Sequence, residues 1–287
     1  MPSPLKLNQA LLGQESQKIP EAVLAILEVQ GALSQANLSQ VDLYQFNFGG
    51  VDLQKANLHQ AILVRARLSQ ADLSHGDLSA ADLRGADLGK ALLTYANLQG
   101  ACLYRANLCG ADFSSADLTN AKLQGARYDS QTRFPEGFAY KSCGAIGPSA
   151  NLNGAPLNTA NLRCADLQGA NLLGAYLGGA DLTGANLWGA RLTHADLRRA
   201  WLTGAFLRQA RLNGANLAGA DLRAADLTEA EFEQFESIAG ADFSQVQGLS
   251  PEMRSRLLSH PEQQLNTPHP LTCQTTRESL LESEVRS

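Results

Sequence analysis

The sequence predicts a solenoid, an elongated body made of stacked short repeats, and three observations point to this fold class. In the stretch Ala71–Leu88 every fifth residue is Leu, the residue two before it is Ala or Gly, and Asp lies between them. A period of five matches neither the period of about 3.6 of a helix nor the period of about 2 of a strand. Leu and Ala dominate the composition while aromatic residues make up only 6%, which favours a repeat body over a globule.

Residues 1–30 lack the repeat, and we expect an N-terminal helical cap there. Pro20 and Glu21 suit the first turn of a helix, the sequence AVLAILEVQ supplies an apolar side, and Gly31 suits its end. The first coil of a solenoid would otherwise expose an apolar end and unpaired backbone groups. Docking of a partner is the alternative role for this helix.

Two repeat arrays follow, at residues 31–128 and 150–245. The apolar centres of the first run from Leu33 in steps of five to Tyr128, and those of the second from Leu152 to Phe232. After a one-residue slip, Ile238 and Phe243 provide two further centres.

Residues 129–149, DSQTRFPEGFAYKSCGAIGPS, break the register and are interpreted as an inserted loop, because proline and glycine mark turns. The apolar residues of this loop, Phe134, Phe138, Tyr140 and Ile146, are able to fold back onto the solenoid. At the far end Ser250 and Pro251 suit the start of a helix that continues to about His260, so a second cap is expected over 246–260. Residues 261–287 are rich in Pro, Thr, Gln and Ser and are expected to be a disordered tail, with at best a short helix near Leu280.

The repeated pattern A(D/N)LxG resembles the signature of the pentapeptide-repeat family, and the chain is similar to the long members common in cyanobacteria. The resemblance implies an all-β solenoid: a right-handed quadrilateral parallel β-helix in two stacked arrays with short α-helical caps at both ends. Four pentapeptides then form the four sides of each coil. The central Leu and the small residue two before it would face inward, while the residue before Leu and the two after it face solvent. Residues twenty apart would stack, with Leu73 under Leu93.

The charge balance weakens the best-known activity of that family, in which strongly acidic members imitate DNA and protect DNA gyrase. Mimicry needs a dense, regular field of negative charge. The net charge here is −5, but residues 31–127 hold eight Lys or Arg against eight Asp, and residues 151–230 hold seven Arg against six acidic residues. Basic residues such as Arg67, Arg191 and Arg211 interrupt the acidic columns. A gyrase-binding DNA mimic is therefore an alternative hypothesis.

No catalytic residue, metal site or cofactor is predicted. The five histidines fall on different columns or in the terminal segments, and no His, Cys and carboxylate set has the spacing of a metal site or a catalytic triad. No apolar run approaches the length of about 20 residues that spans a bilayer, and the N-terminus does not resemble a secretory signal. Five cysteines without metal-ligand spacing fit a reducing compartment, so we expect a cytoplasmic location.

Aromatic residues interleaved with arginines in the second array form the candidate partner-binding surface, because these residue types are enriched in interface hot spots. The spacing puts Trp188 and Arg208 in one column and Phe206 in another column of the same face, and it puts Trp201 and Tyr176 on other faces. The full candidate set is Trp188, Phe206, Arg208, Arg198, Arg199, Trp201 and Tyr176. A weaker counterpart in the first array groups Tyr44, Arg65, Arg84, Tyr104 and Arg105.

These features predict a non-catalytic scaffold that binds a protein partner through flat solenoid faces during assembly or regulation of a larger complex. Nucleic-acid binding is disfavoured, since Asp residues share those faces and there is no basic excess. Besides the DNA mimic, a purely structural rod or dimerisation module is an alternative, with surface aromatics that bind nothing. The sequence leaves the partner's identity and the oligomeric state open.

Overall fold

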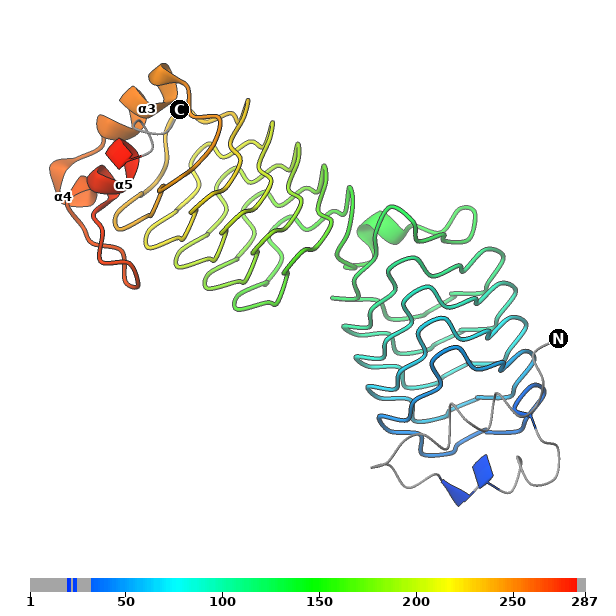
Figure 1. Ribbon diagram of the computed structural model, residues 1–287. Coiled ribbons are helices and arrows are strands. Elements are labelled where there is room, and N and C mark those ends of the chain that lie inside the picture. Colours follow the sequence, from blue (N-terminus) through cyan, green and yellow to red (C-terminus); the bar gives the residue numbers. More distant parts are fainter. Residues whose placement is uncertain (1–19, 22, 25–31, 283–287) are drawn as a thin grey trace. The chain divides into compact units, whose positions relative to one another are not determined.

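Both repeat arrays in the computed structural model are stacks of four-sided coils joined by parallel β-bridges (Figure 1). The structure describes residues 20–21, 23–24 and 32–282, and the chain divides into two compact units, Met1–Ile146 and Gly147–Ser287. Most bridges join residues 20 positions apart, as in Asn57 to Asp77 and Asp77 to Asn97. Four such columns run along each unit, so four segments of five residues complete one coil. Stacking of the two arrays on each other stays a prediction.

Each coil is paired with its neighbours through the backbone at every side. Leu58 N donates to Asp77 O (2.7 Å) in the following coil, and Asp77 N donates back to Ala56 O (3.0 Å). At the corners a turn is closed by a bond such as that from Ala61 N to Leu58 O (3.0 Å). The third residue of that turn, Gln60, has a φ of 56°, as a type II turn requires at this position.

The inward and outward positions agree with those predicted from the repeat. Leu73 and Leu93 are fully buried, as is Ala71, while Asp72 and Ser74 in the same repeat are partly exposed and His75 is exposed. The aspartates and asparagines that precede the central Leu bond to local backbone: Asp72 Oδ1 accepts from Ser74 N at 3.0 Å. These polar ladders therefore serve the turns of the coil.

The segment after Tyr128 forms β-bridges with the coils of the first unit. This finding corrects its interpretation as an inserted loop. Arg133 forms a bridge with Asp112 at an offset of 21 residues, and Ile146 forms one with Arg127 at an offset of 19. The coil from Arg127 to Ile146, which contains Arg133, therefore has 19 residues instead of 20 and still returns to the same bridge column. A short 3₁₀ helix, η1 (Tyr140–Ser142), lies between the two bridges.

Aromatic rings hold this segment onto the coil, which is one of the two possibilities that the sequence left open. The ring of Phe134 stacks on Phe113 with centroids 5.8 Å apart and on Tyr140 with centroids 4.7 Å apart. Tyr128 meets Phe134 edge to face at 5.5 Å. These contacts bury apolar surface at the end of the first array.

At the N-terminal end the described residues fit the start of the expected helix. Val23 N and Leu24 N both donate to Pro20 O, at 2.9 and 3.1 Å, and Val23 is fully buried. The remainder of the predicted cap over residues 1–30 lies outside the described residues. In the first coils Phe46 and Val51 fill inward positions that elsewhere hold Ala, and both are buried.

Three helices follow the second array (Figure 1). Helix α3 (Pro251–Leu258) begins as predicted, with Ser250 Oγ accepting from Met253 N at 3.2 Å. Helices α4 (Glu262–Leu265) and α5 (Thr276–Glu282) lie where the sequence predicts a disordered tail. The expectation of disorder is wrong for residues 262–282, in which Leu265 and Leu280 are buried, whereas α5 is the short helix that the sequence allowed near Leu280. A one-residue excess near Phe235 shifts the last bridges to an offset of 21, which confirms the predicted slip before Ile238.

The C-terminal helices are ordered because their side chains form hydrogen bonds with backbone groups of the last coil. Ile238 N and Phe243 N occupy positions that elsewhere donate to the following coil. Here Ile238 N donates to Gln264 Oε1 (3.0 Å) and Phe243 N donates to Ser279 Oγ (3.1 Å). Thr276 Oγ1 donates to Ile238 O at 3.0 Å. Polar side chains thus replace the missing next coil, as a buried backbone edge demands.

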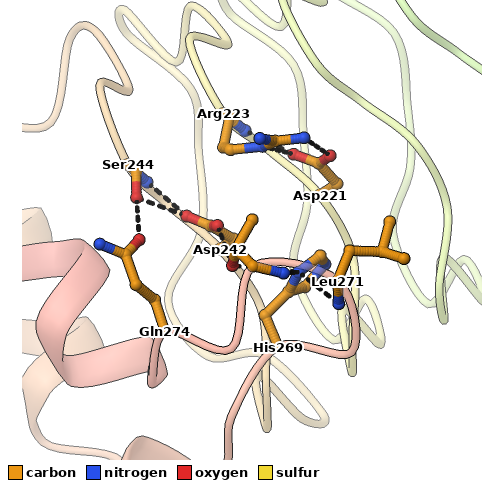
Figure 2. Close-up of polar contacts among 8 residues, drawn as sticks. Asp221, Arg223, Asp242, Ser244, His269, Leu271 and Gln274 are labelled. Carbon is orange, nitrogen blue, oxygen red and sulfur yellow. Dashed lines mark hydrogen bonds and ion pairs between the residues drawn. The ribbon is translucent and has the colours of Figure 1, made fainter.

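The loop between α4 and α5 adds a buried polar cluster on the last coils (Figure 2). Asp242 is fully buried, and its carboxylate accepts from Ser244 Oγ at 2.6 Å and from Thr272 Oγ1 at 2.7 Å. Asp221 in the preceding coil pairs with Arg223 at 2.7 Å. Each buried carboxylate is therefore provided with donors, as burial of a charge requires.

Leu93→Ala should destabilise the first array by about 2–5 kcal/mol, because it removes a fully buried side chain between Leu73 and Phe113 of the same inward column. Leu92→Ala is the matched control: Leu92 is the adjacent residue, it is 45% exposed, and its truncation should cost less than about 0.5 kcal/mol. Urea denaturation followed by circular dichroism measures both. Equal effects of the two substitutions would contradict the inward and outward assignment.

Ser279→Ala should weaken the C-terminal cap by about 1–3 kcal/mol, because it leaves Phe243 N buried without its acceptor. Hydrogen exchange should become faster at the amide of Phe243. Ser259→Ala is the control, since Ser259 is exposed and bonds only to Arg256 O within α3 and its cap. Unchanged exchange at Phe243 in the Ser279 variant would show that the helices do not cap the coil.

Candidate protein-interaction surface

The second array presents four sides, and each is named here by the first residue of its bridge column. The Asn151 side continues through Asn171, Arg191, Arg211 and Glu231. The Pro156 side continues through Tyr176, Asp196, Asn216 and Ser237. The Asn161 side continues through Asp181, Trp201, Asp221 and Asp242, and the Asp166 side through Asn186, Phe206, Asp226 and Gln247.

Three of the predicted residues gather at one corner, which we call the Trp188 corner: Trp188, Phe206 and Arg208. Trp188 and Arg208 occupy successive turns between the Asp166 and Asn151 sides, and Phe206 lies on the Asp166 side next to them. Trp188 and Phe206 are 18 residues apart. Arg163 and Asp181, separated by the same interval, are in direct contact at 3.2 Å. The repeat geometry therefore places Trp188 and Phe206 at neighbouring positions on adjacent coils.

The indole of Trp188 is fixed by a chain of hydrogen bonds that sequence reasoning missed. Its Nε1 donates to Gln209 Oε1 at 3.0 Å, and Gln209 Nε2 donates to Glu229 Oε2 at 2.7 Å. The signal was available in the repeat, because Gln209 follows Arg208 in the next turn and Glu229 lies one coil further. A tryptophan held in this way loses less conformational entropy when a partner covers it.

A shallow polar hollow adjoins Trp188 on the Asn151 side. It is lined by Gly189, Arg191, Gln209, Arg211, Glu229 and Glu231. Arg211 Nε lies 3.1 Å from Glu231 Oε2 across this hollow. Apolar rings beside a polar hollow resemble the core and rim of a protein interface.

Arg208 is held at the apolar edge of the same corner. Its Nε lies 3.8 Å from Asp226 Oδ2 on the Asp166 side. The arginine side chain is 54% exposed, so this ion pair contributes at most about 1 kcal/mol. Arg208 therefore keeps donors available to a partner.

The other four predicted residues lie away from this corner. Tyr176 is on the Pro156 side, where Arg198 lies in the turn after Asp196. A hydrogen bond and ion pair from Arg198 at 2.7 Å hold the pKa of Asp196 below its usual value. Trp201 stands on the Asn161 side between Asp181 and Asp221, and Arg199 occupies the turn between the Pro156 and Asn161 sides.

The four exposed aromatics are therefore distributed over three sides. Their exposed fractions are similar: Trp188 46%, Trp201 49%, Phe206 51% and Tyr176 54%. Exposure alone does not distinguish them, whereas adjacency does. Only Trp188 and Phe206 among these four share a side or its corner.

Two kinds of feature are absent from the described residues. Over residues 32–282 and the described part of the N-terminus, no group of three or more His, Cys, Asp or Glu side chains is placed to hold a metal ion. In the same part of the chain, none of the helices has both the length and the apolar character needed to cross a bilayer.

Comparisons with solved structures find pentapeptide repeat proteins. One from the thylakoid lumen of Arabidopsis thaliana is 32% identical, with a TM-score of 0.42 over 46% of this chain and 87% of its own. HetL, involved in the regulation of heterocyst differentiation in the cyanobacterium Nostoc sp. strain PCC 7120, is 28% identical, with a TM-score of 0.29 over 78% of this chain and 97% of its own. QnrB1, a plasmid-mediated fluoroquinolone resistance protein, is 18% identical, with a TM-score of 0.31 over 77% of this chain and 95% of its own.

No curated protein sequence matches the chain. The family model described as pentapeptide repeats matches it in eight overlapping copies, at residues 33–70, 61–100, 71–108, 91–127, 149–175, 160–199, 170–209 and 190–229. These matches cover more than half of the sequence and coincide with the coils of both units. The chain therefore belongs to the pentapeptide repeat family.

Proposed function

We propose that this protein is a non-catalytic scaffold that binds a protein partner through the Trp188 corner, in the assembly or regulation of a larger complex. The observation that carries the proposal is the adjacency of Trp188, Phe206 and Arg208 on a rigid coil, beside a polar hollow. Trp and Arg are enriched among the residues that dominate binding energy. Of the seven residues that the sequence suggested, the proposed contact uses these three. It leaves out Tyr176, Trp201, Arg198 and Arg199.

The rigidity of the support favours this use. Phe206 N donates to Ala185 O at 2.9 Å, and Leu187 N donates to Phe206 O at 2.8 Å, so the backbone beneath the ring is tied to the coil before it. The indole of Trp188 is held by Gln209. A surface that is ordered before binding pays less entropy on association, which suits a scaffold.

The DNA-mimic alternative is weakened by the pairing of acidic side chains. Asp82, Asp196 and Asp221 each form an ion pair with the arginine two residues later, at 2.6–2.7 Å. Arg163 similarly contacts Asp181 at 3.2 Å. A duplex imitation needs acidic groups that are not neutralised by neighbours.

We infer that both arrays wind in the right-handed sense of the family's quadrilateral β-helix, and that the helices at the C-terminal end act as a permanent cap. The inference draws on family membership and on the bonds from α4 and α5 to the last coil. In this arrangement the sides of the coils are the surfaces left for a partner.

The test is affinity purification of the tagged full chain from cells of the source organism, with mass spectrometry of the proteins that are retained. Trp188→Ala with Phe206→Ala should remove the partner, because loss of two hot-spot rings costs at least about 2 kcal/mol, or roughly 30-fold in affinity. Both side chains are about half exposed, so the fold should be unaffected.

Tyr176→Ala with Trp201→Ala is the matched control, since it removes two rings of equal exposure from other sides. The partner should be retained by this variant. Retention by both variants would refute the Trp188 corner as the contact. Inhibition of gyrase supercoiling by the purified protein would favour the DNA mimic instead.

A further inference from the structure

Arginines in the first array are confined to one region of its surface. All five arginines between residues 33 and 127 are found on one side and its adjoining corner: Arg65, Arg67, Arg84, Arg105 and Arg127. Arg67 and Arg127 belong to the bridge column that starts at Asn47. The other three occupy the turns between the Asp42 and Asn47 columns, which we call the Tyr44 corner.

A groove runs along the Tyr44 corner. It is lined by Tyr44, Val64, Arg65, Arg84, Gly85, Tyr104 and Arg105. Gly85 occupies the turn position that holds Arg65 in the coil before and Arg105 in the coil after, and it leaves that position without a side chain. Two coil spacings separate Arg65 from Arg105, about 9.5 Å.

The two outer arginines of this groove are not neutralised within the chain. Arg84 forms an ion pair with Asp82 at 2.6 Å. Over the described residues, neither Arg65 nor Arg105 has an ion-pair partner, and both are exposed. The nearby carboxylates of Asp42 and Asp87 already accept bonds from the backbone of their own turns, at 3.0 Å each.

The opposite sides of the same array are acidic. Five of its eight aspartates lie in the columns that start at Asn37 and Asp52: Asp52, Asp72, Asp77, Asp112 and Asp117. Although the array holds equal numbers of basic and acidic residues, its arginines and most of its aspartates therefore lie on different sides. A partner meets a basic face or an acidic face according to the side it approaches.

We propose that the Tyr44 corner binds an extended acidic segment of a partner protein, with carboxylates on Arg65 and Arg105 and the rings of Tyr44 and Tyr104 flanking them. Guanidinium groups bind carboxylates through paired hydrogen bonds. In an extended polyproline II conformation, residues three apart lie on the same face and about 9.3 Å apart, which matches the separation of the two arginines. Three aspartates share this region, namely Asp42, Asp82 and Asp87, and they disfavour a nucleic acid, whose phosphates form a continuous line of charge.

The test measures fluorescence anisotropy of a labelled polyglutamate peptide titrated with the full chain at low ionic strength. Arg65→Gln with Arg105→Gln should weaken binding at least about tenfold, because both charge-assisted contacts are lost. Arg65→Lys with Arg105→Lys should weaken it less, since the charge remains but the forked geometry does not. Circular dichroism melting confirms that each variant is folded.

Lys55→Gln with Arg133→Gln is the matched control, because it removes the same charge from the Asp52 column and its corner with the Asn37 column. Binding should change less than about twofold in this variant, because screening limits distant charges. An equal loss in the control, or no binding by the unaltered chain, would overturn the proposal. An oligothymidine of matched charge that binds more tightly than the peptide would overturn the choice of partner.

Discussion

The hydrogen bonding of each coil to the coils before and after it is the constraint on which the rest of this protein depends. Leu58 and Asp77 illustrate this pairing. The N–H of Leu58 bonds to the coil that follows it, and the N–H of Asp77 bonds to the coil that precedes it. Because the pairing must recur at every side, the residues at equivalent positions are forced into columns. The small inward residue, the central Leu and the left-handed turn position all follow from this one requirement.

Most of the architecture was predictable, because the five-residue spacing determines which residues face inward and which residues stack on one another. The inward columns through Leu73 and Leu93, the slip before Ile238 and the helix after Ser250 were all readable from spacing. The C-terminal segment was not, since its polar composition resembles a disordered chain. Gln264, Thr276 and Ser279 are polar because they replace the hydrogen bonds of an absent coil. Composition alone cannot distinguish a side chain that caps a backbone from one that is solvated.

The candidate surface was predictable in position but not in detail. Column arithmetic placed Trp188, Phe206 and Arg208 together and separated them from Tyr176 and Trp201. The bond from Trp188 to Gln209 depends on rotamers across a corner, which no spacing rule provides. The separation of charge in the first array was likewise hidden, because a count of residues between two points ignores the side on which each one lies.

The four-sided repeat also determines how such a protein can change length. An insertion of four repeat units adds one complete coil and moves every later side chain along the axis without turning it. An insertion of a single unit instead moves every later residue to the next side, so that Trp188 and Phe206 would point a quarter turn away from their present direction. The coil from Arg127 to Ile146 has 19 residues instead of 20 and still returns to its column, so the irregular segment around η1 does not move Ile146 to another side. Lengthening by whole coils is therefore the growth that keeps each surface residue on its own side of the coil.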